Sequence, residues 1–183
     1  MARQRAACTI TTPLATGLLA VSLSLPLAAT PALAHAQASA AGLAARDRAA
    51  FRRVWPSVQQ CSADLNTVTG DLQRASGNLG AGDADTGSLG RDGTQMRNDC
   101  LAAAARVNRL HFAAGARHTA ARRVKAELHA ALVELAQGAA DCTQIAQDLA
   151  GGDVDDAVVL LQRGASAWKA AAAHMRVVTS YVH

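Results

Sequence analysis

The stretch LHAALVELAQGAADCTQIAQDL, residues 128–149, decides the fold of this chain. Its apolar residues recur at alternating steps of four and three, the spacing of one face of an α-helix. They are Leu128, Leu132, Leu135, Ala139, Cys142, Ala146 and Leu149. Alanine and leucine, two strong helix formers, supply most of this face. The pattern therefore predicts a helix that buries one stripe of side chains.

Three further stretches repeat the same spacing before and after it. They run from Val54 to Leu72, from Met96 to Leu110 and from Val154 to Met175. The chain after residue 34 is also rich in alanine and poor in β-branched runs, which favours helices over strands. We therefore predict an all-α protein with four helices.

Two clear breaks separate these stretches. The segment GNLGAGDADTGSLGRDG, residues 77–93, is predicted to be a long loop rich in glycine and aspartate. The segment AGGD, residues 150–153, is predicted to be a tight stop in which Asp153 caps the following helix. The first loop therefore separates the first two helical stretches, 54–72 and 96–110. The second separates the last two, 128–149 and 154–175.

The break between the second and third helical stretches, 96–110 and 128–149, has a weaker signal. A single helix over residues 92–149 would be about 87 Å long, too long for this chain to cover. We therefore place a break at 115–118, with Thr119 as the N-cap of the next helix. In the first stretch, Pro56 predicts a kink, or a helix that begins there after a shorter segment. Trp55 is predicted to pack against that kink rather than to be exposed.

The short connections predict an antiparallel, up-down-up-down four-helix bundle. In that arrangement one end collects basic residues from the four helices: Arg46, Arg48, Arg52, Arg53, Arg106, Arg109, Arg117, Arg122, Arg123, Lys125 and Arg176. The other end collects acidic ones: Asp71, Asp83, Asp85, Asp92, Asp99, Asp141, Asp148, Asp153, Asp155 and Asp156. The bundle is therefore expected to be electrically polarised along its axis.

The Arg-rich end is the predicted functional site. The expected anion-binding residues are Arg52, Arg53, Arg106, Arg109, Arg117, Arg122, Arg123 and Lys125. A cell-wall polymer, lipid headgroups or an acidic protein would suit such a surface. Without the leader arginines, the 18 basic residues become 16 against 14 acidic ones, a net charge of +2. This small net charge does not favour a nucleic-acid partner.

The first 34 residues have the features of a secretory signal peptide. Arg3 and Arg5 form a basic start, an apolar stretch follows over residues 14–25, and small residues precede a cut after Ala34 or Ala36. A short tail over 35–45 and one helical domain over 46–183 are expected to follow. We therefore predict a secreted protein, with no membrane span in its mature part.

Three cysteines remain after the leader, and an exported protein is expected to form disulfides. Cys61 and Cys100 lie about 22 and 20 Å from the basic end along their helices, so a Cys61–Cys100 bridge is predicted. A Cys100–Cys142 bridge is the alternative, if the turn near Gly115 is loose. The unpaired cysteine could also join two copies of the chain in a dimer.

The four apolar stripes contain apolar residues and cysteines, whereas an active site inside a helical bundle needs inward ionisable groups. No catalytic residue is therefore predicted, and we expect a binding protein rather than an enzyme. The alternative is a small-molecule enzyme in which Arg106, Arg122 or Arg123 converges with Glu127 in a concave pocket.

The sequence gives little support for a metal or a cofactor. No histidine after the leader is spaced from a second ligand as in the usual zinc patterns, and no C-x-x-C-H motif occurs. A bundle that holds a metal, or a haem between Met96 or Met175 and a histidine, is a further alternative. We predict no cofactor and no metal ligand.

Overall fold

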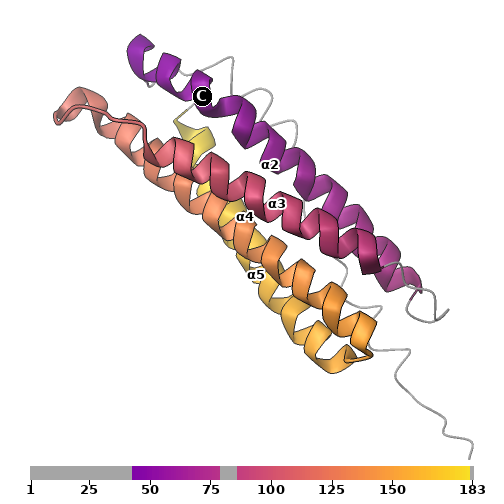
Figure 1. Ribbon diagram of the computed structural model, residues 1–183. Coiled ribbons are helices and arrows are strands. Elements are labelled where there is room, and N and C mark those ends of the chain that lie inside the picture. The colour runs from indigo at the N-terminus through magenta and orange to yellow at the C-terminus, as the bar shows by residue number, and fades with distance from the viewer. Residues whose placement is uncertain (1–42, 79–85, 182–183) are drawn as a thin grey trace, which may run out of the picture.

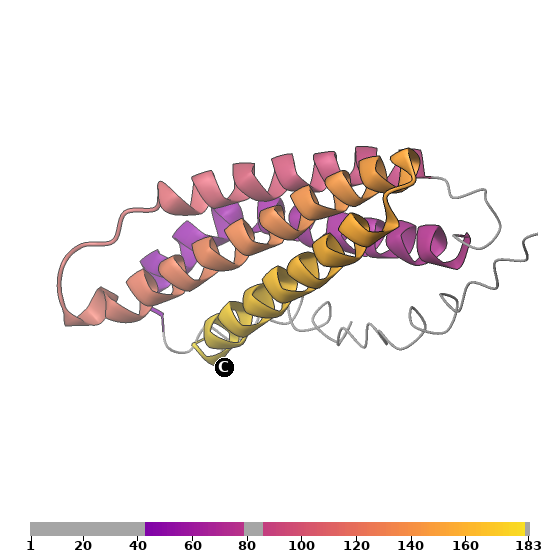
Figure 2. The same cartoon turned by 90° about the horizontal axis from the view of Figure 1, so that it is seen from below.

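The computed structural model describes residues 43–78 and 86–181 (Figures 1 and 2). These residues contain no strand. Their helices are α2 (Ala45–Asn78), α3 (Thr86–Asn108), α4 (Thr119–Gly151) and α5 (Val154–Ser180), with a 3-10 turn η2 (Ala116–His118) before α4. The prediction of an all-α fold with four helices is confirmed for this part of the chain. The predicted signal peptide, 1–34, lies outside the described residues.

Side-chain contacts define how α2 lies against α3. Ser57 in the first half of α2 accepts a hydrogen bond of 2.7 Å from Arg106 near the end of α3. Farther along α2, Cys61 forms a disulfide with Cys100, with a Cα–Cα distance of 4.9 Å. The partner's number falls as the residue number on α2 rises, so the two helices run in opposite directions.

Helix α4 packs along both α3 and α5. Thr94 of α3 and Thr143 of α4 place their hydroxyl oxygens 3.5 Å apart, and Glu127 of α4 contacts His174 of α5 at 2.7 Å. Figures 1 and 2 show α5 beside α4, and α2 on the other side of α3. Among the described residues, none of the helices has the length and apolar character that a membrane crossing requires.

The predicted loop over 77–93 is wrong at both its ends. Helix α2 continues to Asn78 and α3 begins at Thr86, so 86–93 is helical in spite of its glycines. Gly93 is buried against α4, where a Cβ atom would lie 2.9 Å from Thr143 Oγ1 and 3.1 Å from the Ala139 carbonyl oxygen. This glycine allows the close approach of two helices, so packing outweighs its low helix propensity.

Helix α2 is continuous through Pro56, so the prediction that a helix begins at this proline is wrong. Pro56 is exposed, whereas Val54, Trp55 and Val58 around it are buried in one core. The carbonyl that lacks an amide partner because of the proline therefore belongs to the solvent side of α2. Packing on both sides of Pro56 holds the helix together, and Trp55 is part of that packing.

The connections around α4 include the predicted breaks, but α3 already ends at Asn108, so the break predicted at 115–118 extends back to residue 109. Thr119 is the first residue of α4, whereas His118 occupies the N-cap position and makes no side-chain cap. The predicted N-cap at Thr119 is therefore wrong, because the chain enters α4 through the turn η2. At the other end, Gly152 adopts a positive φ of 83°, and Asp153 caps α5 by accepting the Asp156 amide at 3.4 Å.

The core contains much of the predicted apolar stripes together with the disulfide, and Met96, Leu128 and Leu132 of those stripes are fully buried. Leu89 and Ile145, which the stripes did not include, are also fully buried, whereas Val154 at the start of the last stripe is exposed. The predicted Cys61–Cys100 bridge is confirmed, and the alternative pairing of Cys100 with Cys142 is wrong. Cys142 is a free thiol buried in the same core.

Candidate functional site

The first turns of α2 and α4 and the last turns of α3 and α5 meet at one end of the molecule. Asp47 of α2 contacts His118 before α4 at 2.9 Å. The Phe51 and Phe112 rings stack with centroids 5.3 Å apart, and Arg123 of α4 lies over the ring of Tyr181. We call residues 45–53, 106–125 and 174–181 the basic end.

The basic end contains eleven arginine and lysine residues and one acidic residue, Asp47. All eight cations of the predicted site lie within it. Seven are exposed: Arg52, Arg53, Arg106, Arg109, Arg117, Arg122 and Arg123. Lys125 is partly buried. The structure therefore brings the predicted residues to one end of the protein.

The cations whose contacts are defined interact with neutral groups. Arg106 donates to the Ser57 hydroxyl, Lys125 donates to the Leu110 carbonyl oxygen at 2.9 Å, and the Arg123 guanidinium lies 5.5 Å from the centroid of the Tyr181 ring. Within residues 43–78 and 86–181, none of the eight predicted cations forms an ion pair with a carboxylate. Their positive charges are therefore not neutralised by a neighbouring acid.

These cations form a distributed surface rather than a single pocket. Arg52 and Arg53 are neighbours on α2, so their side chains leave the helix about 100° apart. Arg122 and Arg123 have the same relationship on α4. Such an arrangement suits an extended anionic partner, which can contact several cations at once.

Two histidine–carboxylate pairs, one within the basic end and one that joins it to Glu127 just beyond its edge, did not follow from the sequence pattern. His118 Nδ1 lies 2.9 Å from Asp47 Oδ2, and His174 Nδ1 lies 2.7 Å from Glu127 Oε2. Both acids thus interact with imidazole rings from another part of the fold and not with the exposed arginines. No short-range spacing connects these residues, because the members of each pair come from different elements.

The alternative enzyme site requires a hollow that receives arginines together with Glu127. The described residues line an open groove of about 550 Å³ between α3 and α4, which includes Gly90, Thr94 and Thr143. They also line a small apolar gap between α2, α4 and α5. Neither hollow includes a residue of the basic end or Glu127. Glu127 is instead engaged by His174.

The expectation that the apolar stripes contain no ionisable groups is wrong. Asp47, Asp71 and Asp141 are buried, with 3 %, 1 % and 1 % of their surfaces exposed. Each has a cation or imidazole partner, and Arg163 Nε donates to Asp141 Oδ1 at 2.9 Å. In the described part of the chain, no three His, Cys, Asp or Glu residues are grouped so that they could hold a metal ion.

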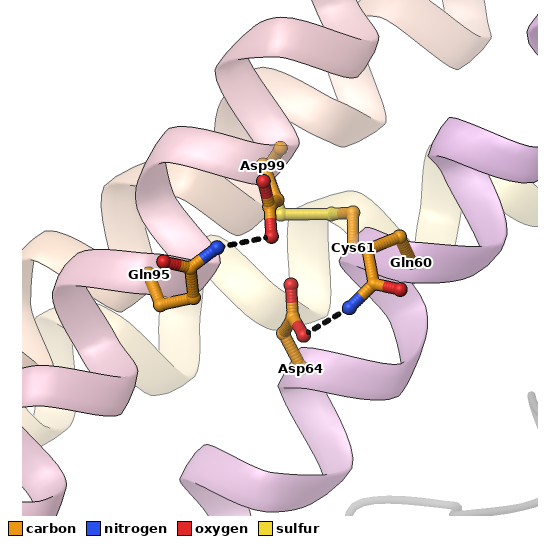
Figure 3. The surroundings of a disulfide bond; sticks show 6 residues. Gln60, Cys61, Asp64, Gln95 and Asp99 are labelled. Atoms are coloured by element: carbon orange, nitrogen blue, oxygen red, sulfur yellow. Dashed lines mark hydrogen bonds between the residues drawn. A yellow bond between two sulfur atoms is a disulfide. The ribbon is translucent and has the colours of Figure 1, made fainter.

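The acidic residues away from the basic end are not one cluster. Asp64 and Asp99 face one another across the contact between α2 and α3 (Figure 3), and Asp71 of α2 and Asp92 of α3 lie seven residues farther along the same two helices. Asp141 pairs with Arg163, and Asp153 caps α5. Asp83 and Asp85 lie outside the described residues. The sequence pattern did not reveal the proximity of acids across the α2–α3 contact or the pairing of Asp141 with Arg163.

The free thiol of Cys142 lies in a setting that disfavours its ionised form. Burial, and then the charge of neighbouring Asp141, raise the pKa of the thiol to about 12. A thiolate is the reactive form of cysteine, so this side chain is expected to be inert at neutral pH while it stays in the core. A dimer joined through Cys142 remains a prediction, and it would require this residue to leave the core.

No family model, curated protein or solved structure matches this chain.

Proposed function

We propose that this chain is an exported, non-enzymatic binding protein that contacts an anionic partner through its basic end. In this proposal the helices form the up-down-up-down bundle that their contacts support. The observation that carries the proposal is the charge balance of the basic end, with eleven cations against one acid, Asp47. Because exposed charges are screened over about 10 Å, a partner meets this local charge rather than the small net charge.

The burial and pairing of Asp47 add to the argument. Asp47 is 3 % exposed and is held by His118, so it does not offset the arginines on the surface. Charges that only support solubility are usually mixed in sign, whereas here one sign dominates. A one-sided surface attracts an oppositely charged partner and speeds its association.

The aromatic residues favour a hydrophilic polymer over insertion into a lipid membrane. Phe51 and Trp55 are each 8 % exposed, and Phe51 stacks on the partly buried Phe112. Proteins that insert into the membrane interface usually present exposed aromatic or leucine side chains beside their basic residues. The exposed large apolar residues of the described part are Leu101, Val133, Val154 and Val159, all outside the basic end. We therefore favour an anionic cell-wall polymer as the partner.

The test is the salt dependence of binding to an isolated poly(glycerol phosphate) polymer. The matched probes are liposomes with and without anionic lipid. Because cation–polyanion contacts release counterions, the affinity should fall steeply between 50 and 200 mM salt, by an order of magnitude or more. Binding to anionic liposomes alone would contradict the polymer and indicate headgroups as the partner.

The variant Arg117→Ala, Arg122→Ala, Arg123→Ala should lose at least tenfold in affinity and show a shallower salt dependence. A control variant with the same charge change carries Arg91→Ala, Arg97→Ala and Lys169→Ala, which are exposed cations outside the basic end. It should keep most of the binding. Equal loss in both variants would mean that the net charge, and not the basic end, determines binding.

A further inference from the structure

The contact between α2 and α3 contains carboxyl groups that face one another beside the disulfide (Figure 3). Gln60 Nε2 donates to Asp64 Oδ1 at 2.8 Å, and Gln95 Nε2 donates to Asp99 Oδ2 at 2.7 Å. Each glutamine therefore occupies one oxygen of the carboxyl on its own helix. The Asp64 and Asp99 carboxyls point toward one another across the contact, and the other oxygen of Asp64, Oδ2, is buried without a donor.

A second pair lies farther from the basic end. Its members are Asp71 of α2 and Asp92 of α3, and Arg74 donates to Asp71 Oδ1 from one helical turn away. Asp71 is 1 % exposed, and its Oδ2 atom has no donor. The two pairs are seven residues apart on each helix, so both lie on the same stripe of the α2–α3 contact.

Carboxyls placed in this way resist ionisation. Burial is the largest cause that raises the pKa of Asp64, and the neighbouring Asp99 and Asp92 raise it further. Burial also raises the pKa of Asp71, with a further contribution from Asp92, whereas Arg74 lowers it. Among the described residues, the charged groups that act on these two carboxyls belong to α2 and α3, and α4 contributes none.

We propose that the pairs Asp64–Asp99 and Asp71–Asp92 form an acid-strengthened clasp between α2 and α3, and that the Cys61–Cys100 disulfide holds α2 in place when the clasp is ionised. When one carboxyl of a pair is protonated, it donates a hydrogen bond to the other. When both are ionised, the two like charges repel one another across the contact. The attachment of α2 therefore weakens as the pH rises.

The position of α2 makes this clasp important for its attachment. Helix α2 packs mainly against α3, whereas α4 is held by both α3 and α5. A change at the α2–α3 contact therefore acts on the attachment of a whole helix. The disulfide lies directly beside the Asp64–Asp99 pair, so it limits how far the two helices can separate at that level.

The test is amide hydrogen exchange of residues 57–75 in the full chain at pH 4.5 and pH 7.5, with labelling times scaled to the intrinsic rate at each pH. After this correction for the intrinsic rate, we expect the amides of residues 57–75 to exchange at least threefold faster at pH 7.5 than at pH 4.5. The variant Asp64→Asn, Asp71→Asn should remove most of this difference. If this variant does not fold, Asp99→Asn tests the first pair from the opposite helix. If the corrected exchange rate of the wild type is the same at both pH values, the proposal is overturned.

Two further variants separate the clasp from general effects of pH. Asp148→Asn alters an aspartate that accepts a 2.7 Å bond from Gln144 one turn before it, the same local arrangement as Gln60 and Asp64. It should leave the pH dependence of α2 unchanged, and a loss equal to that of the variant Asp64→Asn, Asp71→Asn would contradict the clasp. Cys61→Ser with Cys100→Ser should enlarge the difference between the two pH values. An unchanged difference would overturn the role given to the disulfide.

Discussion

The indole of Trp168 on α5 occupies the space that a side chain at Gly138 on α4 would need. A Cβ atom built at position 138 would lie 2.9 Å from Cε2 of Trp168 and closer still to other atoms of the ring. Gly138 and Trp168 are both buried, with Trp168 4 % exposed. The glycine therefore lets α5 bring its large aromatic side chain against the backbone of α4.

Gly138→Ala should destabilise the protein by about 1–3 kcal/mol, because the added methyl group overpacks this contact. The expected gain in helix propensity, about 1 kcal/mol, does not offset the clash. Urea denaturation followed by circular dichroism measures the change. Gly70→Ala is the matched control on α2, since nothing lies within 4 Å of a Cβ at that position. It should be neutral or stabilising, and a loss of stability equal to that of Gly138→Ala would contradict the packing argument.

Cys61→Ser together with Cys100→Ser should lower the free energy of unfolding by about 2–4 kcal/mol, because the unfolded chain gains conformational freedom. The disulfide closes a loop with a sequence separation of 39 residues. Urea denaturation of the oxidised wild type and the double variant gives the difference. Addition of a reductant should destabilise the wild type by the same amount and leave the variant unchanged.

Arg163→Ala should destabilise the protein more than Lys169→Ala, although both cations are exposed on α5. Arg163 is bound to Asp141, which is 1 % exposed, so its removal leaves a buried carboxylate without its cation. Thermal unfolding of the two variants makes the comparison. The variant Asp141→Asn in the Arg163→Ala background should recover part of the lost stability, because it removes the unpaired charge.

The raised pKa of Asp64 and Asp71 predicts the sign of a pH effect on stability. In the folded state these carboxyls bind protons up to a higher pH than in the unfolded chain, where their pKa is about 3.8. Their contribution to stability is therefore largest in acid and falls as the pH rises through the raised pKa. Asp64→Asn should stabilise the protein relative to wild type at pH 7.5, and the difference should shrink toward pH 4. Urea midpoints across this range test the sign.

Cys142 should resist alkylation in the folded protein. Its burial and the pKa of about 12 keep the thiol protonated and inaccessible at pH 7.5. Iodoacetamide should label the peptide that contains Cys142 only after denaturation, as followed by mass spectrometry. Rapid labelling under native conditions would show that this part of the core opens readily.

The helices could be predicted because each carries a long apolar stripe, and the spacing of a stripe is a local property of the chain. The same spacing located Cys61 and Cys100 at similar distances from the basic end, which favoured their disulfide, and the structure excludes the alternative Cys100–Cys142 bridge. The chain also determined which cations lie at that end, because the ends of long helices fall at positions set by the breaks.

Other features depended on contacts between residues far apart in the chain. Gly93 reads locally as part of a loop, but it is helical because α4 packs closely against it. Asp47 and Asp141 are buried because His118 and Arg163 reach them from other elements.

The sequence by itself thus determined the helical class and favoured one of two disulfide pairs. Only the tertiary structure decided which glycines admit a neighbouring helix and which carboxyls face one another, as Asp64 and Asp99 do. The physical reason is that propensity and periodicity act over a few turns of one helix. Burial and charge pairing depend instead on the register between helices, which is set by the packing of the whole core.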